Sequence, residues 1–597
     1  MGVQEDSVMS REGKLFDLKF KAIVIGNILE YWDFSVFGTL IDVLAELFFP
    51  EVNELMSFLQ GAAVFGAAFF MRPIGGIIFG IIGDLYSREL ALTLSVALML
   101  ITSLMLCFLP TYDELGIYAT ILLILIRLMQ GIAVGGEFVG SMVFIHEGAQ
   151  SFHGLWGGAT KASAVFGNTL GLGVAAILRY ALSDAQLRSY GWRIPFGIGA
   201  VIGLFGVASR NRLMAYMEEE KKATALLRVV ETGTDRVGIR REMLSPVPIA
   251  SATLLAPSAP RASTSNDGAW LTISSMESIT EEDDCVKEEG NSKVDQADTS
   301  PCYFVGSEYL LELAVSFGFI TFWCLAYYTV FVWNLYFLTT DELIGDSVIS
   351  KRDAWLIIFI SNCLVPCILP VSGYLGDLVQ TWHTHRIANS VNERTVAQEL
   401  SNRVWGHVMI MKGSALLMLL TCVGAYQLML CNGAEHWRLV VGQIMLTLCT
   451  AFYGGNMAAV LAELYPVQVR YTGMGISYNV CNALVSGTAT IAQSYLVMAD
   501  GLKSSTPWLT NTGGKYLWCS PFQALFADKR LHAALYLQCV SVLALFSLSF
   551  GIARCSHRDF LRKLKSSAGD REAATHTSTS SGGRAIPHLT QIYIQRG

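Results

Sequence analysis

Carboxylates and guanidinium groups occur inside apolar stretches in the first half of the chain. Glu30 and Asp33 lie in the stretch GNILEYWDFSVFG, and Arg72, Arg127 and Glu137 lie in later apolar stretches. Because Glu30 and Asp33 are three residues apart, a helix would present both on one face. A charge at the centre of a bilayer costs roughly 2.5–3.5 kcal/mol even on insertion scales, so each of these residues is a candidate for function.

The depth of each charge follows from a rise of about 1.5 Å per helical residue. Counted from the nearer predicted end of each stretch, Glu30 and Asp33 lie about 12–18 Å deep, Arg72 about 18 Å and Arg127 about 16 Å. Half of a hydrocarbon core is about 15 Å. We therefore expect these four side chains to lie at a similar depth near the midplane, on three different helices.

Opposite charges at one depth support two interpretations. One is a structural ion-pair cluster that only holds the helices together, although desolvation offsets most of that attraction. The other is a water-filled path in which an arginine binds a substrate carboxylate while a carboxyl group, whose protonated form burial favours, gains and loses a proton. We favour the second, with Arg72 as the first choice for the substrate and Glu30, Asp33, Arg127 and Glu137 for proton coupling.

The elements that position these residues are membrane-spanning helices. Of the 597 residues, 52% are hydrophobic and only 15% are charged, and the mean hydropathy is +0.44. Apolar stretches long enough to cross a bilayer recur along the chain. We predict an all-α membrane protein, embedded in a lipid bilayer, with twelve transmembrane helices in two six-helix bundles. The predicted spans are 22–48, 56–82, 90–110, 116–142, 157–181, 192–210, 309–338, 353–378, 405–427, 437–463, 472–499 and 532–553.

Polar segments divide the chain into five predicted parts. These are a cytosolic N-terminal tail at 1–21, a first bundle at 22–210, a largely disordered cytosolic linker at 211–308, a second bundle at 309–553 and a disordered cytosolic tail at 554–597. Basic residues before the first span and after the sixth and twelfth place both termini in the cytosol. The start of the chain lacks the features of a signal peptide, so the first span is expected to remain. The plasma membrane is the default location.

Charge, cysteine and histidine patterns exclude several other classes. The net charge of −7 is concentrated in one polar segment, so it indicates no nucleic-acid partner. The sequence shows no Ser-His, Cys-His, HExxH or P-loop pattern, so we expect no enzyme, no catalytic residue, no metal and no cofactor. His146, Glu147 and His153 are expected to face water in a short turn. Cys431 and Cys519 fall in loops predicted on one side, and their pairing is left open.

Five blocks of sequence carry a resemblance to a known family. They are GNILEYWDFSVFG, FFMRPIGGIIFGIIGDLYSRE, TYDELGIYATILLILIRLMQGIAVGGEFVGSMVFIHE, YGWRIPFGIG and ELYPVQVRYTGMGISYNVCNALVSGTA. In order and spacing they resemble the metabolite:H⁺ symporter family of the major facilitator superfamily, most closely its proline/betaine branch. Other members handle α-ketoglutarate, citrate or shikimate. The resemblance implies a two-bundle fold with alternating access.

The resemblance also implies a gate between the two bundles. GDLYSRE places Gly83, Asp84 and Arg88 in the superfamily's gating motif, where Asp84 would cap a helix of the other half and Arg88 would contact a helix end. RLMQG places Arg127 in a motif linked with proton coupling. In the second half, GYLGDLVQTWHTHRI keeps Asp377 but lacks the usual basic pair, and Ser87 replaces a glycine in the first copy. A weaker or differently built second gate is expected.

Polar residues are fewer in the second half. Glu463 and Arg470 flank the turn ELYPVQVR, where gating and a solvated interfacial pair are equally good interpretations. Asn334 and Asn479 lie well inside their spans and would bind either substrate or a neighbouring helix. Tyr31 is a further candidate for the substrate. A second hypothesis groups it with three other aromatic residues in a cage for a quaternary ammonium group. The other members of that cage are Trp32, Tyr328 and Trp333.

These observations lead to one functional hypothesis and two rivals. The hypothesis is proton-coupled symport of a small carboxylate-bearing or zwitterionic metabolite by a monomer with the major facilitator fold. The first rival is a proton-independent uniporter or anion exchanger. The second is a transporter-like nutrient sensor, in which 211–308 is the signalling element. The charges near the midplane favour transport.

Overall fold

The computed structural model describes residues 2–49, 54–236, 309–339, 351–388, 399–430, 436–486, 532–556 and residue 558. These residues form helices joined by short turns, and no strand occurs among them. Residues 219–299 form a unit separate from the rest, and of that unit the structure describes only the end of one helix. Cys431 and Cys519 lie outside the described residues.

The first half contains seven long or medium helices and two short ones. They are α1 (Gly2–Thr39), α2 (Ile41–Phe48), α3 (Glu54–Leu85), α4 (Arg88–Cys107), α5 (Tyr112–Leu115), α6 (Ile117–Gly148), α7 (His153–Ala181), α8 (Asp184–Gln186) and α9 (Arg193–Arg236). The predicted first span is thus divided between α1 and α2 at Leu40. The predicted sixth span continues without a break to Arg236, beyond the predicted end at residue 210.

The second half contains the helices α11 (Leu310–Tyr328), α12 (Asn334–Thr339), α14 (Lys351–Ala388), α15 (Glu399–Leu430), α16 (His436–Glu463), α17 (Arg470–Cys481) and α20 (His532–Phe546). Wider π-helical turns continue three of them at Thr329–Trp333, Asn482–Ser486 and Ser547–Gly551. Within the described ranges, ten helices are long and apolar enough to cross a membrane. The predicted first span, and the predicted eleventh, which is described only to Ser486, are not among the ten.

Local sequence signals explain where several helices begin. Ser87 caps α4, since its hydroxyl accepts a hydrogen bond from the Leu90 amide at 3.1 Å. The serine that departs from the family's glycine is therefore a favourable helix start. Thr111 and Glu114 form a capping box around α5, which satisfies two amide groups that a helix start leaves unpaired.

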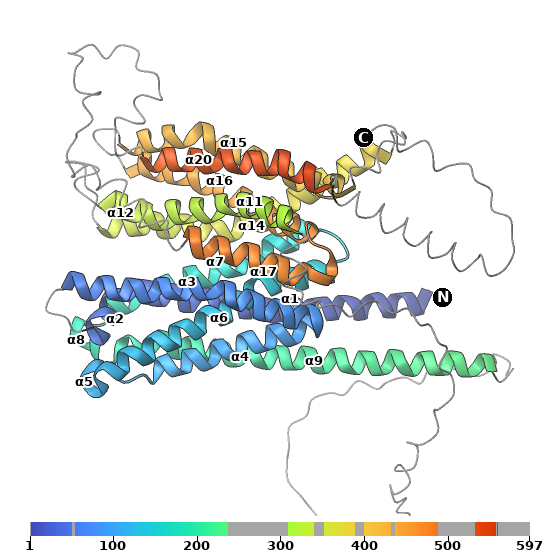
Figure 1. Cartoon of the computed structure of the whole chain (residues 1–597), viewed down its shortest axis with the longest axis horizontal. Coiled ribbons are helices and arrows are strands. Elements are labelled where there is room, and N and C mark those ends of the chain that lie inside the picture. Colours follow the sequence, from blue (N-terminus) through green and yellow to red (C-terminus); the bar gives the residue numbers. More distant parts are fainter. Residues whose placement is uncertain are drawn as a thin grey trace, which may run out of the picture. The chain divides into compact units, whose positions relative to one another are not determined.

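The two halves meet along pairs of helices, one helix from each half. In the first pair α3 packs against α17, and in the second α7 packs against α14 and α16. Figure 1 shows the blue-to-green helices of the first half and the yellow-green-to-red helices of the second. Because one helix of each pair comes from each bundle, these two crossings hold the bundles together.

Glycines allow close backbone contact at both crossings. A Cβ atom on Gly475 of α17 would lie 2.8 Å from the carbonyl oxygen of Gly76 in α3. At the other crossing, a Cβ atom on Gly373 of α14 would overlap the carbonyl oxygen of Gly154 in α7. Small residues let membrane helices approach until their backbones touch, and any larger residue at these positions would separate the two halves.

Candidate functional site

Asp33 and Arg127 belong to one buried hydrogen-bonded network in the first bundle. Asp33 of α1 accepts hydrogen bonds from the Ser103 hydroxyl of α4 and, at 3.3 Å, from Gln130 Nε2 of α6. Arg127 Nη1 donates to Gln130 Oε1 at 2.8 Å. Gln130 therefore links the carboxylate to the guanidinium, and no direct ion pair joins the two in the described part of the chain. We call these four residues the Asp33 network.

Arg127 is held by aromatic rings more than by hydrogen bonds. Its Cζ atom lies 4.0 Å from the centroid of the Phe37 ring and 4.9 Å from that of Phe34. Its Nε and Nη2 atoms are buried without a hydrogen-bond partner in the residues that the structure covers. A desolvated cation over an aromatic face gains up to about 2 kcal/mol, so the rings compensate part of the cost of burial.

Glu30 and Arg72 form a second group next to the Asp33 network. Glu30 is fully buried, and neither of its carboxylate oxygens has a hydrogen-bond partner among the described residues. The guanidinium of Arg72 interacts electrostatically with it. Arg72 lies over two rings, 4.4 Å from the Phe34 centroid and 4.6 Å from that of Phe69. We call Glu30 and Arg72 the central pair.

Phe34 connects the central pair to the Asp33 network. Its ring contacts the guanidinium of Arg72 and that of Arg127. The structure therefore brings together four of the residues that the sequence selected, on the three predicted helices α1, α3 and α6. An unpartnered buried carboxylate is costly unless it holds a proton or an ion pair, so this arrangement suits a group that exchanges a proton.

Glu137 lies in a different place from the other four. It forms a buried ion pair with Arg210 of α9, and Ser95 of α4 donates to it at 2.5 Å. Arg210, which the sequence placed in the basic flank after the sixth span, is also buried. The partner of Glu137 is thus Arg210, which lies on α9 at the predicted end of the sixth span.

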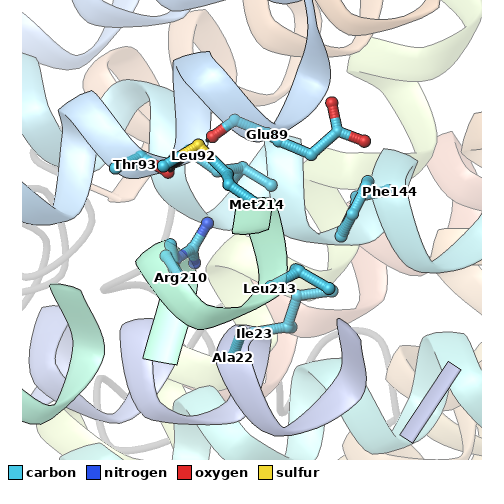
Figure 2. A pocket seen from close by; sticks show the side chains of 9 residues that line it. All are labelled: Ala22, Ile23, Glu89, Leu92, Thr93, Phe144, Arg210, Leu213 and Met214. Carbon is cyan, nitrogen blue, oxygen red and sulfur yellow. Dashed lines mark hydrogen bonds between the residues drawn. The ribbon is translucent and has the colours of Figure 1, made fainter. Parts of the chain in front are cut away.

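A small pocket adjoins this ion pair. The nine residues lining it come from α1, α4, α6 and α9 and include Arg210, Glu89 and Phe144. Figure 2 shows Arg210 beside Leu213 and Met214, with Leu92 and Thr93 opposite. The pocket contains neither member of the central pair, and the role of Glu137 in proton coupling stays a prediction.

Asp84 makes the contact with the other bundle that the sequence predicted. Its carboxylate accepts hydrogen bonds from the backbone amides of Tyr471 at 3.2 Å and Thr472 at 2.8 Å, at the start of α17. Arg88 forms an ion pair with Asp84 and donates at 2.7 Å to the carbonyl of Val467. A carboxylate at a helix N-terminus satisfies unpaired amides and opposes the positive end of the helix dipole.

Further contacts surround this cap. Arg88 donates at 2.6 Å to the carbonyl of Gly83 and pairs with Glu147 at 3.2 Å. Glu147 also pairs with Arg470 at 3.2 Å. The first-half motif and the start of α17 therefore share one charged cluster. We call the end of the bundles that carries this cluster the gate end.

Asp377 makes the corresponding contact in the opposite direction. From α14 it accepts hydrogen bonds from the amides of Gly154 at 2.9 Å and Leu155 at 2.8 Å, at the start of α7. His407 of α15 lies 3.5 Å from its carboxylate and pairs with Asn456 Oδ1 at 2.9 Å. In this gate, whose sequence lacks the usual basic pair, a histidine from another helix stands beside Asp377.

Glu463 and Arg470 do not pair with each other. Glu463 contacts His146 at 3.1 Å and Arg403 at 3.6 Å, whereas Arg470 pairs with Glu147. The expectation that His146 faces water is wrong, because this histidine is buried between the halves and its ring lies 4.5 Å from that of His153. No group of three metal-binding side chains occurs among the described residues.

The two asparagines are engaged by neighbouring helices. Asn334 donates to Gln443 at 2.9 Å and accepts from the Tyr426 hydroxyl at 2.6 Å. Asn479 donates to the carbonyls of Gly135 at 2.7 Å and Gly475 at 2.9 Å. The structure therefore favours the helix-contact interpretation over substrate binding for both.

The four residues of the proposed aromatic cage do not surround one common space. Tyr31 packs edge-on against Phe138, with centroids 5.6 Å apart, and interacts electrostatically with Tyr328 and with the central pair. Trp32 points to α9, where its Nε1 donates to the Pro195 carbonyl at 2.9 Å. The four rings do not converge, because Tyr31 and Trp32 are consecutive residues and lie on different faces of α1.

Sequence reasoning missed several partners. Gln130 was inside the quoted motif RLMQG, three residues after Arg127, so helical spacing was an available signal. Ser103 and His407 carried no such signal, since their partners are distant in sequence. Lys161 of α7, a fully buried lysine, stood in a stretch dominated by small residues and was not considered.

Asp84→Asn is expected to weaken the closed gate. The change removes the charge at the start of α17, and a cap of this kind contributes about 0.5–2 kcal/mol. The rate at which N-ethylmaleimide labels the buried native Cys324, applied from the gate end in membrane vesicles, should therefore rise about threefold to thirtyfold. Asp113→Asn, at an exposed carboxylate of α5, serves as the matched control. An unchanged rate for Asp84→Asn would show that the cap does not hold the gate.

Comparison with known proteins connects this geometry to a fold. A family model described as "Sugar (and other) transporter" matches residues 19–213, about a third of the chain. The structure of the major facilitator proton:xylose symporter XylE, bound to 6-bromo-6-deoxy-D-glucose, matches with a TM-score of 0.52 at 12% identity, over 90% of this chain and 95% of that one. A double-tryptophan mutant of XylE gives a TM-score of 0.55 at 13% identity, with 91% and 98% coverage. This chain has the major facilitator fold.

Curated relatives of this chain are named as transporters. An alpha-ketoglutarate permease of Escherichia coli (strain K12) is 39% identical over 199 residues, which are 33% of this chain and 46% of that protein. A putative proline/betaine transporter of Staphylococcus haemolyticus is 24% identical over 508 residues, 84% of this chain and 86% of that one. The proline/betaine transporter of E. coli is 34% identical over 196 residues, 32% and 39% of the two chains.

These matches confirm the resemblance found in the sequence. The stronger identities cover less than half the length of the permease and of the E. coli proline/betaine transporter, and they are near the length of the first bundle. The prediction of an integral multi-pass membrane protein is confirmed. The prediction that the chain is not an enzyme is confirmed as well, because the family model and these relatives describe transporters.

Proposed function

We propose that the protein is a secondary active transporter that couples the uptake of a small carboxylate-bearing or zwitterionic metabolite to protons. The observation that carries this proposal is the central pair, in which a fully buried carboxylate without hydrogen-bond donors lies beside a buried arginine. Ionisable residues inside the membrane commonly mark substrate and proton pathways. The relatives named for proline/betaine and α-ketoglutarate support the substrate class.

The central pair couples the two solutes by competition for Arg72. Without substrate, the guanidinium compensates the charge of Glu30. When a substrate carboxylate binds Arg72, Glu30 loses part of that compensation and takes up a proton. Release of the substrate restores the electrostatic compensation by Arg72 and expels the proton. Because each ligand favours binding of the other, the coupling is reciprocal.

The Asp33 network has a supporting role in this scheme. Asp33 accepts hydrogen bonds from Ser103 and Gln130. Through Gln130 it orients Arg127, and the Phe34 ring lies between Arg127 and Arg72. The network thereby fixes the position of the substrate-binding arginine and of Glu30.

Alternating access requires the gate end to open and close. The caps at Asp84 and Asp377 are both made in this structure, and both must break for the bundles to separate there. We further propose that the gate end faces the cytosol, that both termini lie on that side, that the protein is a monomer in the plasma membrane, and that protons are the only coupling ligand, with no other cofactor.

Uptake by the purified full-length protein in proteoliposomes tests the proposal. Radiolabelled proline, betaine, α-ketoglutarate, citrate and shikimate are supplied with and without an inward proton gradient. Accumulation that depends on the gradient supports symport. Equal uptake under both conditions contradicts proton coupling and indicates a uniporter or exchanger. Binding without any flux contradicts transport and indicates a sensor.

Asp33→Asn and Arg127→Gln are each expected to abolish proton-driven uptake while the protein still reaches the membrane. Each change breaks the Asp33 network and leaves its opposite partner buried without compensation. The measurement is gradient-driven uptake, normalised to the amount of folded protein in the vesicles. Wild-type uptake by both variants would remove the network from the coupling mechanism.

A further inference from the structure

His146 is a buried histidine at the gate end that the transport scheme above does not use. It lies in the last turn of α6, in the first bundle, with a relative exposure of 8%. Its Nε2 atom lies 3.1 Å from Oε1 of Glu463, the last residue of α16 in the second bundle. This contact crosses the boundary between the bundles, so it must break when the gate end opens.

Other contacts across this boundary combine carboxylates with helix ends or with a guanidinium group. Asp84 caps α17, Asp377 caps α7, and Glu147 pairs with Arg470 at 3.2 Å. Imidazole is the side chain whose charge ordinarily changes between about pH 5 and 8. Among these described contacts, the one made by His146 therefore gains a charge when the pH falls through that range.

The place of Glu463 decides which ring holds the proton. The His153 ring lies 4.5 Å from the His146 ring, and its Nδ1 atom has no hydrogen-bond partner in the described part of the chain. Two imidazolium rings this close repel each other, so a single proton resides on the ring that faces a carboxylate. That ring is His146, which also benefits from the negative end of the α6 dipole in its last turn.

The charged groups around His146 leave this assignment unchanged. His407 lies 3.5 Å from Asp377, which belongs to the same bundle, so a proton on His407 adds no contact between the bundles. Arg403 lies 3.6 Å from Glu463, again within one bundle. Further charged groups on the elements that pack at this end are Lys19 of α1, Asp84 of α3, Arg88 of α4, Glu147 of α6 and Arg470 of α17. The carboxylates among them are paired with arginines, so Glu463 is the carboxylate that meets His146.

We propose that His146 and Glu463 form an acid-sensitive lock, in which protonation of His146 turns their contact into an ion pair between the bundles and holds the gate end closed. This inference rests on the transport function and the cytosolic gate end proposed above. Uptake with protons acidifies the compartment that receives them. The lock therefore slows the cycle as protons accumulate on the gate-end side, and it limits acid loading by the transporter itself.

The test follows the labelling of Cys324 by N-ethylmaleimide, applied from the gate end in membrane vesicles that hold the full-length protein. The rate for His146→Gln is divided by the wild-type rate at the same pH, so that the pH dependence of the thiol itself cancels. Glutamine keeps a neutral donor for Glu463, so the ratio should be close to unity at about pH 7.5. At about pH 5.5 it should rise to about threefold to tenfold, because a charged donor strengthens the wild-type contact by that order.

Two further variants and a control make this test specific. Glu463→Gln removes the other half of the lock and should lose the same pH response, and the double variant should respond as each single one does. His436→Gln, at an exposed histidine of α16, should keep the wild-type response. A His146→Gln ratio that is the same at both pH values would show a purely structural contact and overturn the lock. Loss of the response in His407→Gln, with its retention in His146→Gln, would also overturn it.

Labelling requires no flux, so this inference and the transport proposal fail separately. In proteoliposomes, acid on the gate-end side should slow uptake by the wild type more than uptake by His146→Gln. A labelling ratio that rises in acid, in a protein without gradient-driven uptake, would support the lock and contradict proton coupling. Gradient-driven uptake together with a ratio that does not change with pH would support transport and contradict the lock.

Discussion

Glu30→Gln is expected to abolish accumulation against a gradient while substrate exchange continues. Glutamine keeps the size and polarity of the side chain but cannot carry a proton, so the carrier binds substrate as if it were always protonated. A proton gradient of one pH unit drives at most about a tenfold accumulation, and in the variant the ratio should fall to about one. The measurement is the steady-state ratio of labelled substrate inside and outside proteoliposomes.

Counterflow provides the control for this result. Vesicles loaded with unlabelled substrate should still exchange it with labelled substrate through the Glu30→Gln protein, at a rate that no longer depends on pH. Glu30→Asp, which retains a carboxyl group, should keep some gradient-driven accumulation. Wild-type accumulation by Glu30→Gln would assign the proton to another residue, and loss of counterflow together with accumulation would point to a structural role.

Arg210→Met is expected to have the largest effect on stability. It leaves Glu137 buried without its partner, and breaking a buried pair from one side costs about 3–5 kcal/mol. The pair is enclosed by α1, α4, α6 and α9, and Gly26 of α1 packs directly against both side chains. The expected outcome is a marked fall in the unfolding temperature in detergent and in the amount of protein in the membrane.

The double variant Arg210→Met/Glu137→Gln distinguishes charge from packing. A neutral glutamine still accepts the hydrogen bond from Ser95 and leaves no uncompensated charge, so most of the lost stability should return. Arg212→Met, at the exposed neighbouring arginine, should change little. If the double variant is as unstable as the single one, the cost arises from the lost volume of Arg210 instead of from the charge of Glu137.

The candidate site near the midplane could be predicted because a charged side chain in a bilayer has a large free-energy cost, whichever way its helix is rotated. Residues were counted from the predicted end of each span, and this count gave a common depth for Glu30, Arg72 and Arg127. The structure places these residues together around Phe34. Depth along a helix does not give rotation about its axis. For this reason the sequence did not identify Gln130 as the direct hydrogen-bond partner of Arg127.

The gate could be predicted in part. Asp84 stands in a motif whose position at the end of a helix restricts its carboxylate to a few partners, and it caps α17. The interactions of His407, His146 and Arg210 depend on which residue of a distant helix faces them. The local sequence does not determine these contacts. Hydropathy marks only the end of the apolar part of the sixth span, and the first turns of the polar segment, which were expected to extend this helix, continue it to Arg236.

The glycine-lined crossings have a consequence for the speed of the transport cycle. Where Gly475 of α17 meets Gly76 of α3 and Gly373 of α14 meets Gly154 of α7, the atoms in contact are backbone atoms. When two helices interdigitate, sliding forces each side chain out of its rotamer, and this raises the activation barrier. Surfaces without side chains shift past one another with few such rearrangements, so turnover should be limited by breaking the polar contacts around them. Fast cycling and tight closure are then controlled by different atoms of the same interface.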